Sequence, residues 1–328
     1  MTPDNDTLRE LHRQMVRIRV FEETLARVYL EGKTPAFDIA AGPVPGEMHL
    51  AAGQEPVAAG VCLHLRPTDA VTATHRPHHQ ALAHGVDMKL LAAEIFGKET
   101  GLGHGKGGHM HLFSREPAFG CSGIIGEGIP TAVGHALAFT KQGRDDVAVS
   151  FFGEGAANQG AFHESLNLAA LWTLPVIFVC EDNAWAISVP KASATAIPNN
   201  SDRASAYGIP GVLIPENDPV AIYEAAGEAV ARARSGGGPS LIEITTDRLL
   251  GHFEGDPQVY RSKETIAALR ERDAIPRFEK RLVELGVTTD GDVAAVWEAC
   301  RAEVEEAIAF ARESPYPAPE SALEHVFA

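Results

Sequence analysis

The chain has 328 residues, of which 45% are hydrophobic, 22% charged and 7% aromatic. This composition is that of an ordinary globular protein and excludes a disordered, collagen-like or fibrous chain. The formal net charge of −16 argues against nucleic-acid binding, because a phosphate backbone needs a basic protein face. Any anionic ligand must therefore be held by local donor groups that act against the field of the whole chain.

The cysteines and the chain start indicate the compartment. Cys62, Cys121, Cys180 and Cys300 form no C-x-x-C pair, which favours a reduced intracellular protein over a zinc ribbon or a disulfide framework. The first ten residues are polar and acidic, unlike a signal peptide. No segment reaches the ~18 apolar residues typical of a membrane helix. We therefore expect a cytoplasmic chain, complete from Met1, that binds no membrane.

The first hundred residues are expected to be mainly helical. Residues 7–30 and 54–65 carry apolar side chains at helical spacing, and residues 31–46 between them are rich in Gly, Pro and Ala and predict a loop. A short strand is expected over residues 69–74 and a helix over 88–96. The glycines of residues 97–112 predict another loop.

From residue 128 onwards, predicted helices and strands alternate. Continuous apolar runs at 147–152 and 174–180 are typical of strands buried on both faces of a parallel sheet. Further strands are expected at 212–215 and 240–245, and helices at 130–141, 158–171 and 219–234. This alternation predicts an α/β fold with a doubly wound, mostly parallel sheet. We expect one domain over residues 1–328, with a helical N-terminal extension at 1–65 and a helical C-terminal tail at 263–328 that ends at its prolines.

Polar residues follow the two apolar strands. Gly153, Glu154 and Gly155 end the first, and Asn183 follows the second. Ligands of open parallel sheets bind outside the carboxyl ends of the strands, and the start of the next helix favours an anion. A carboxylate, an amide oxygen and a backbone carbonyl are ligands that suit Mg²⁺. The residues predict a Mg²⁺–diphosphate site, although G-E-G alone also fits an ordinary tight turn.

Longer motifs carry a family resemblance. GEGAANQG at 153–160, followed by Asn183, resembles the thiamine diphosphate fingerprint. More narrowly, the chain is similar to the alpha subunit of the thiamine-diphosphate-dependent first component of 2-oxo acid and acetoin dehydrogenase complexes. The resemblance covers nearly the whole chain and includes HLAAGQE at 49–55, HRPHH at 75–79, GKGGHMH at 105–111 and GHFEGDP at 251–257. It implies the diphosphate-binding domain of the thiamine-diphosphate-binding fold.

The resemblance also implies roles for single residues. Mg²⁺ would be bound by Glu154, which replaces the usual aspartate, by Asn183 and by the backbone carbonyl of Trp185. The remaining cofactor-binding residues would be donors to the diphosphate and residues that meet the aminopyrimidine ring. The donors would be the backbone N–H groups of Gly155 and Ala156 and the side chains of His75, Arg76 and His252. Gly153 would belong to the same cofactor-binding loop, and Gly123 and Ile125 would meet the ring. Lys106 is expected to add positive charge at the same site.

Histidines are the candidate catalytic residues. His49 and His252 match positions beside the thiazolium, where a histidine can move protons. Other histidines fit no standard zinc spacing, and His109 and His111 are expected to line the cofactor channel. Glu127 is interpreted as a charge at a helix start, because the glutamate that activates the aminopyrimidine lies on the beta chain in this family.

The implied activity is oxidative decarboxylation of a small 2-oxo acid such as pyruvate, or oxidative cleavage of acetoin. The acyl group would pass to a lipoyl-bearing acyltransferase component. A beta subunit would complete the site, with two alpha and two beta chains in the assembly. The alternatives are branched-chain 2-oxo acid specificity, indicated by G-E-G and by residues 181–189, a transketolase-type enzyme split into two chains, and a non-catalytic subunit that only binds its partner.

Overall fold

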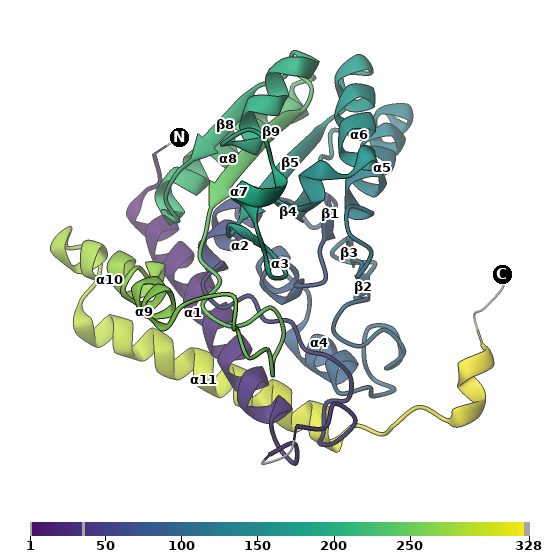
Figure 1. Cartoon of the computed structure of the whole chain (residues 1–328), viewed down its shortest axis with the longest axis vertical. Coiled ribbons are helices and arrows are strands. Elements are labelled where there is room, and N and C mark those ends of the chain that lie inside the picture. Colours follow the sequence, from purple (N-terminus) through teal and green to yellow (C-terminus); the bar gives the residue numbers. More distant parts are fainter. Residues whose placement is uncertain (1, 35–36, 325–328) are drawn as a thin grey trace.

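The computed structural model describes residues 2–34 and 37–324. Within these residues a seven-stranded sheet has the order β2-β3-β1-β4-β5-β9-β8, and all neighbouring strands run parallel except β2 and β3 (Figure 1). The strands are β1 (Ala70–Ala73), β2 (Phe113–Ser114), β3 (Phe119–Cys121), β4 (Ala148–Gly153), β5 (Val176–Asp182), β8 (Gly211–Ile214) and β9 (Ser240–Thr245). The predicted α/β class with a doubly wound, mostly parallel sheet is confirmed.

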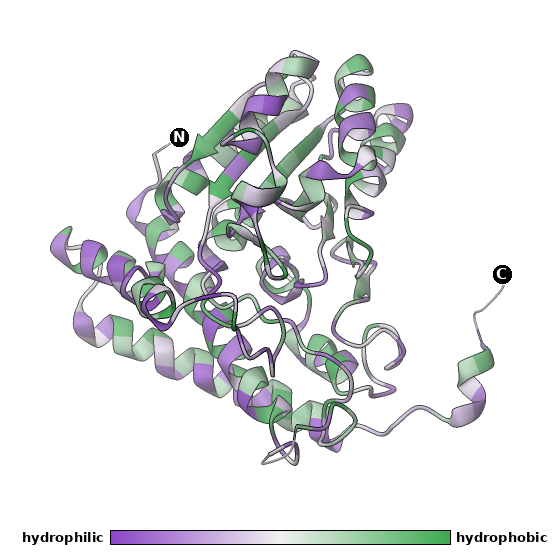
Figure 2. Ribbon diagram, viewed as in Figure 1, coloured by the Kyte–Doolittle hydropathy of each residue, from purple (hydrophilic) through white to green (hydrophobic). Residues whose placement is uncertain are grey.

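Both faces of the central strands are buried. In β4, Val149 and Phe151 belong to one hydrophobic core, whereas Ala148 and Phe152 belong to a second core on the opposite face. Successive side chains of a strand point to opposite faces, so a strand between two helical layers must be apolar at every position. This explains the unbroken apolar runs, which colour the strands green in Figure 2.

Helices cover both faces of the sheet. Side chains of α5 (Gly128–Gln142) and α6 (Gly160–Leu171) fill the core on one face. The other core is filled from α1 (Asn5–Tyr29), α2 (Glu55–Cys62), α3 (His78–His84), α4 (Met88–Ile95), α8 (Pro219–Arg234), α10 (Ala274–Glu284) and α11 (Asp290–Glu313). No helix in the described part of the chain has the length and apolar character needed to cross a membrane.

The N- and C-terminal helices lie together. α11 packs against α1 and α4 (Figure 1). Arg19 of α1 pairs with Glu55 of α2 at 2.5 Å and with Asp273, which precedes α10, at 2.6 Å. α9 (Lys263–Glu271) and α10 precede α11, which ends before Pro315, and a short turn η3 (Pro319–Leu323) follows. Residues 1 and 35–36 of the expected extension and 325–328 of the expected tail lie outside the described residues.

Several short elements were not predicted. They are β2, β3, α3, the hairpin β6 (Trp185–Ala186) and β7 (Val189–Pro190), the one-turn α7 (Lys191–Ala194) and the turn η2 (Asn200–Tyr207). Several predicted helix bounds are displaced by two or three residues: α1 begins at Asn5, α2 ends at Cys62, α5 begins at Gly128, and α6 begins at Gly160 because a separate 3₁₀ turn, η1 (Ala156–Asn158), precedes it. Elements this short are too brief to show a period, so tertiary contacts decide them.

The glycine-rich loop between α4 and β2 is confirmed, and a buried carboxylate organises it. Glu94 of α4 accepts backbone N–H groups of Gly103 and Gly105 at 2.7 and 2.9 Å, and of Gly107 and Gly108 at 2.7 and 3.2 Å. Glycines let the backbone wrap closely around this one side chain. The loop therefore has no regular secondary structure, but four hydrogen bonds to the Glu94 carboxylate fix its backbone.

Candidate active site

A cavity of about 670 Å³ lies at the carboxyl ends of β1, β4, β5 and β9. His75 and Arg76 follow β1, Glu154 follows β4, Asn183 follows β5, and His252 comes from the segment after β9. The twelve residues assigned to catalysis or to cofactor and metal binding all line this cavity: His49, His75, Arg76, Gly123, Ile125, Gly153, Glu154, Gly155, Ala156, Asn183, Trp185 and His252. Because β1 and β4 are neighbours where the strand order reverses direction, this is a topological switch point.

Glu154 is a buried acidic residue in the lining of the cavity. It is only 2% exposed, and its Oε1 has no hydrogen-bond partner among the described residues. Burial, and next the neighbouring Asp182, raises the pKa of Glu154 to about 7. A buried carboxylate oxygen without a partner is costly unless a cation or a proton meets it.

The loops after β4 and β5 touch each other at this point. A Cβ atom on Gly155 would lie 2.7 Å from the Cβ of Ala186, so only glycine permits this approach. Asn183 Oδ1 accepts the backbone N–H of Trp185 at 3.2 Å, which turns the chain sharply after β5. The contact between these two loops thus brings Glu154, Asn183 and the backbone near Trp185 together in the cavity lining.

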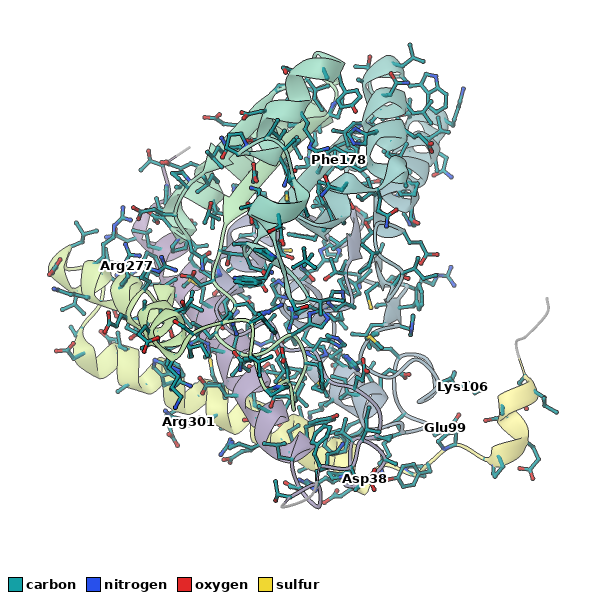
Figure 3. The ribbon with its side chains drawn as sticks, viewed as in Figure 1. Asp38, Glu99, Lys106, Phe178, Arg277 and Arg301 are labelled. Carbon is teal, nitrogen blue, oxygen red and sulfur yellow. The ribbon has the colours of Figure 1, made fainter. Side chains whose placement is uncertain are left out.

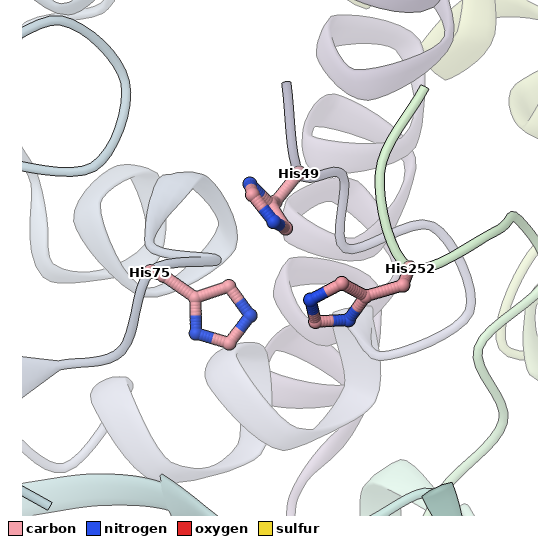
Figure 4. Close-up of side chains that lie close together, drawn as sticks. All are labelled: His49, His75 and His252. Atoms are coloured by element: carbon pink, nitrogen blue, oxygen red, sulfur yellow. The ribbon is translucent and has the colours of Figure 1, made fainter. Parts of the chain in front are cut away.

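Three histidines converge from three segments (Figure 4). One ring nitrogen each of His49, His75 and His252 lies within 4.8 Å of the others. Burial, and next the charge of Arg76, lowers the pKa of all three, to about 3 for His75 and about 4 for His252. The rings are therefore neutral at pH 7. Neither ring nitrogen of His75 has a partner within the part of the chain that the structure describes.

Two guanidinium groups border these histidines. Arg76 donates to the backbone carbonyls of Leu50 and, at 2.8 Å, of His252, so it joins two loops as well as lining the cavity. Burial, and next Arg248, lowers its pKa to about 9. Arg248 donates to the Tyr260 hydroxyl at 2.8 Å and to His252 Nδ1 at 3.4 Å. Three neutral imidazoles could hold a metal ion, but two adjacent positive charges favour an anion.

Arg248 was missed from the sequence. The available signal was an arginine between β9 and the loop at 251–257, but no motif distinguished it. Lys106 was wrongly expected at the site: its ammonium donates to the carbonyl of Ser321, at the edge of the molecule (Figure 3). The second cationic side chain at the cavity is therefore Arg248 and not Lys106.

His109 and His111, the two histidines expected to line the cofactor channel, differ in their positions. His111 lines the cavity as expected. His109 is not among the lining residues; it lies behind His49, with their ring centroids 5.2 Å apart and their planes 18° from parallel. Glu127 directly precedes α5, as expected; it does not line the cavity itself, but its carboxylate accepts a hydrogen bond from Ser122, which does.

Comparison with known proteins identifies the family. Residues 13–320 match the family described as "Dehydrogenase E1 component". The chain belongs to this family. The expected recognition as a first-component alpha chain and the expected enzyme class are thereby confirmed.

Individual relatives of this E1 component chain carry two kinds of name. The alpha subunit of acetoin:2,6-dichlorophenolindophenol oxidoreductase is 43% identical in Bacillus subtilis (97% of this chain, 92% of the relative) and 41% in Cupriavidus necator (99% and 95%). The pyruvate dehydrogenase E1 component subunit alpha of Rhizobium meliloti is 38% identical, over 93% of this chain and 86% of the relative.

Proposed function

We propose that this chain binds Mg²⁺ and thiamine diphosphate as the alpha subunit of a dehydrogenase first component that acts on acetoin or pyruvate. The supporting observation is that one cavity holds both an acidic group suited to a cation and several donor groups suited to an anion. The buried Glu154 carboxylate needs a cation, and beside it Arg76, Arg248 and three neutral histidines offer donors to an anion. In a magnesium diphosphate the Mg²⁺ ion would bind the carboxylate and the diphosphate would bind the donor groups.

The proposed metal ligands are Glu154, Asn183 and the backbone carbonyl of Trp185. Asn183 already bends the chain after β5, which directs this segment towards Glu154. Deprotonated Glu154 would supply the negative charge that Mg²⁺ requires, and Mg²⁺ in turn would offset the cost of burying that charge.

The proposed diphosphate donors are the backbone N–H groups of Gly155 and Ala156 and the side chains of His75, Arg76 and His252. Gly153 would belong to the same cofactor-binding loop, and Gly123 and Ile125, which also line the cavity, would contact the aminopyrimidine ring. Thiamine diphosphate, when bound, supplies the electron sink for cleaving a bond next to a carbonyl. His49 and His252 would hold or move protons beside the reacting carbonyl.

Acetoin and pyruvate are favoured as substrates because the relatives reported above carry those names. The partners would be a beta subunit, in an assembly of two alpha and two beta chains, and a lipoyl-bearing acyltransferase that takes the acyl group. We propose that residues 1–328 act as one diphosphate-binding domain with helical extensions. This domain would supply the diphosphate and Mg²⁺ half of the active site, and the beta chain the aminopyrimidine half.

Calorimetry of the co-expressed alpha–beta pair tests the cofactor. Thiamine diphosphate should bind only in the presence of Mg²⁺, and Asn183→Ala should weaken the affinity at least about a hundredfold, because a metal ligand is lost. Asn5→Ala, an exposed position on α1, is the matched control and should change nothing. Binding without Mg²⁺, or an unchanged affinity in Asn183→Ala, would refute the proposed metal site.

Turnover with 2,6-dichlorophenolindophenol as acceptor tests the substrate. The reconstituted pair should be assayed in parallel with acetoin, pyruvate and branched-chain 2-oxo acids. Acetoin or pyruvate should give the highest kcat/KM. A preference for branched-chain substrates, or ketol transfer without an acceptor, would contradict the proposal.

A further inference from the structure

The hydrogen bonds around His49 determine which of its ring nitrogens carries a proton. Nε2 of His109 lies 3.1 Å from the backbone nitrogen of His49 and 3.0 Å from its Nδ1. A backbone N–H is always a donor, so His109 Nε2 must be an acceptor without a proton. The neutral ring of His49 must then donate from Nδ1, which leaves the lone pair on its Nε2.

The same reasoning gives the opposite result for His252. Its Nδ1 lies 3.4 Å from a guanidinium nitrogen of Arg248, which is always a donor. Nδ1 of His252 is therefore the acceptor, and the proton of the neutral ring lies on Nε2. The rings of His49 and His252 meet edge to face, with their centroids 4.9 Å apart.

We propose that His109 is a positioning residue that fixes His49 as a proton acceptor towards the cavity, opposite His252, which Arg248 fixes as a proton donor. The proposal deepens the proposed function and rests on it, because the two histidines would then act as a base and an acid beside one bound carbonyl. Proton transfer between fixed partners is faster when each ring already has the required tautomer.

The fold holds His109 firmly in this role. Its ring is buried, and it follows directly on the loop that Glu94 binds through four backbone N–H groups. On its other side it meets the ring of His78, at 6.1 Å between centroids, and His78 Nδ1 pairs with the buried Glu22 at 3.2 Å. Glu22 also accepts the backbone N–H of Ala51 at 3.1 Å, two residues after His49. These contacts fix the distance between the side chains of His109 and His49.

Two substitutions of His109 separate the acceptor from the space it fills. In His109→Gln the side-chain amide oxygen can take the place of Nε2 and accept both N–H groups, whereas His109→Leu fills the space without an acceptor. His104→Asn, exposed in the same loop, is the control. The variants should be compared as alpha–beta pairs, by turnover and by calorimetric binding of thiamine diphosphate.

We expect His109→Leu to lower kcat about 10- to 100-fold, with KM and cofactor affinity within about threefold of wild type. His109→Gln should recover most of kcat, and His104→Asn should match wild type. Full activity in a folded His109→Leu pair would overturn the proposal. Equal losses of kcat and cofactor affinity in both His109 variants would also overturn it, because they indicate a purely structural role.

A direct measurement keeps the proposal testable if His109→Leu does not fold. The solid-state ¹⁵N spectrum of the complex, labelled at the histidines of this chain, reports the tautomer of His49, which is assigned by its disappearance in His49→Asn. A protonated Nδ1 supports the proposal and a protonated Nε2 overturns it. This reading does not depend on cofactor binding, so failure of the wild-type pair to bind thiamine diphosphate would refute the proposed function separately.

Discussion

At the scale of single residues, the site consists of groups whose charge state is set by burial. Burial raises the pKa of Glu154 to about 7 and lowers the pKa of His49, His75 and His252, so that the three imidazoles are uncharged at pH 7. Such groups respond strongly to a bound ion. Perturbed carboxyl and imidazole groups that face one cavity are what a site for a charged cofactor requires.

Glu154→Gln tests the cost of this burial in metal-free protein. Because the folded pKa of about 7 lies above the ordinary 4.5, wild type loses stability as pH rises from 4.5 to about 7. Gln cannot ionise and should raise the free energy of unfolding by about 3 kcal/mol at pH 8, but little at pH 5. Urea denaturation at both pH values measures this. An equal increase in the free energy of unfolding at pH 5 and pH 8 would show that ionisation of Glu154 does not cause the destabilisation.

Gly155→Ala tests the contact between the two loops. The added methyl would meet Ala186 at 2.7 Å, so the loops must part and the proposed metal ligands must separate. We expect Mg²⁺-dependent thiamine diphosphate affinity to fall about tenfold or more in calorimetry. Ala186→Gly, combined with Gly155→Ala, removes the opposing methyl and should restore most of the affinity. No recovery in the double variant would contradict the steric explanation.

At the scale of elements, the segment GQE at 53–55 shows how one motif serves both packing and the site. Gln54 lines the cavity, while Glu55 begins α2 and pairs with Arg19 of α1. Glu55 also accepts the backbone N–H of Gly53 at 3.0 Å. A motif that resembles a functional fingerprint thus includes a residue whose contacts are entirely structural.

Glu55→Gln should therefore destabilise the fold. Arg19 would remain buried with Asp273 as its remaining carboxylate partner, and breaking a buried ion pair typically costs about 3–5 kcal/mol. Urea denaturation of the full chain measures the loss. Glu305→Gln, an exposed position on α11, should leave the midpoint unchanged. A loss below about 1 kcal/mol would show that the pair contributes little.

At the scale of the whole molecule, the cavity is open and partly apolar at its rim. Ile124, Ile125 and Ile187 line it and are 67%, 51% and 60% exposed. Large apolar side chains exposed around a binding cavity are typical of a surface that another chain covers. The proposed beta subunit would cover them and complete the site.

This rim predicts that the chain alone is inactive. Turnover of acetoin or pyruvate with 2,6-dichlorophenolindophenol should appear only when the beta chain is added. Ile187→Asp should lower the affinity for the beta chain about tenfold or more, because a charge would be buried in an apolar contact. Analytical ultracentrifugation measures the assembly, and Glu305→Gln is again the control. Full turnover by the isolated chain would contradict the prediction.

The sequence by itself predicted the fold class and placed Glu154 and Asn183 at the ends of two buried strands, and the family resemblance added the other ten of the twelve assigned residues that line the cavity. The fold class and the places of Glu154 and Asn183 follow from local information, because apolar runs mark the buried strands and these two residues come directly after them. Only the tertiary structure decided the partners of those groups. His109 contacts His49 across 60 positions of sequence, and Arg248, not Lys106, contacts His252 at the cavity. These hydrogen bonds join residues that are far apart in the sequence, and burial arises only when the chain folds. Neither can therefore be predicted from a local sequence pattern.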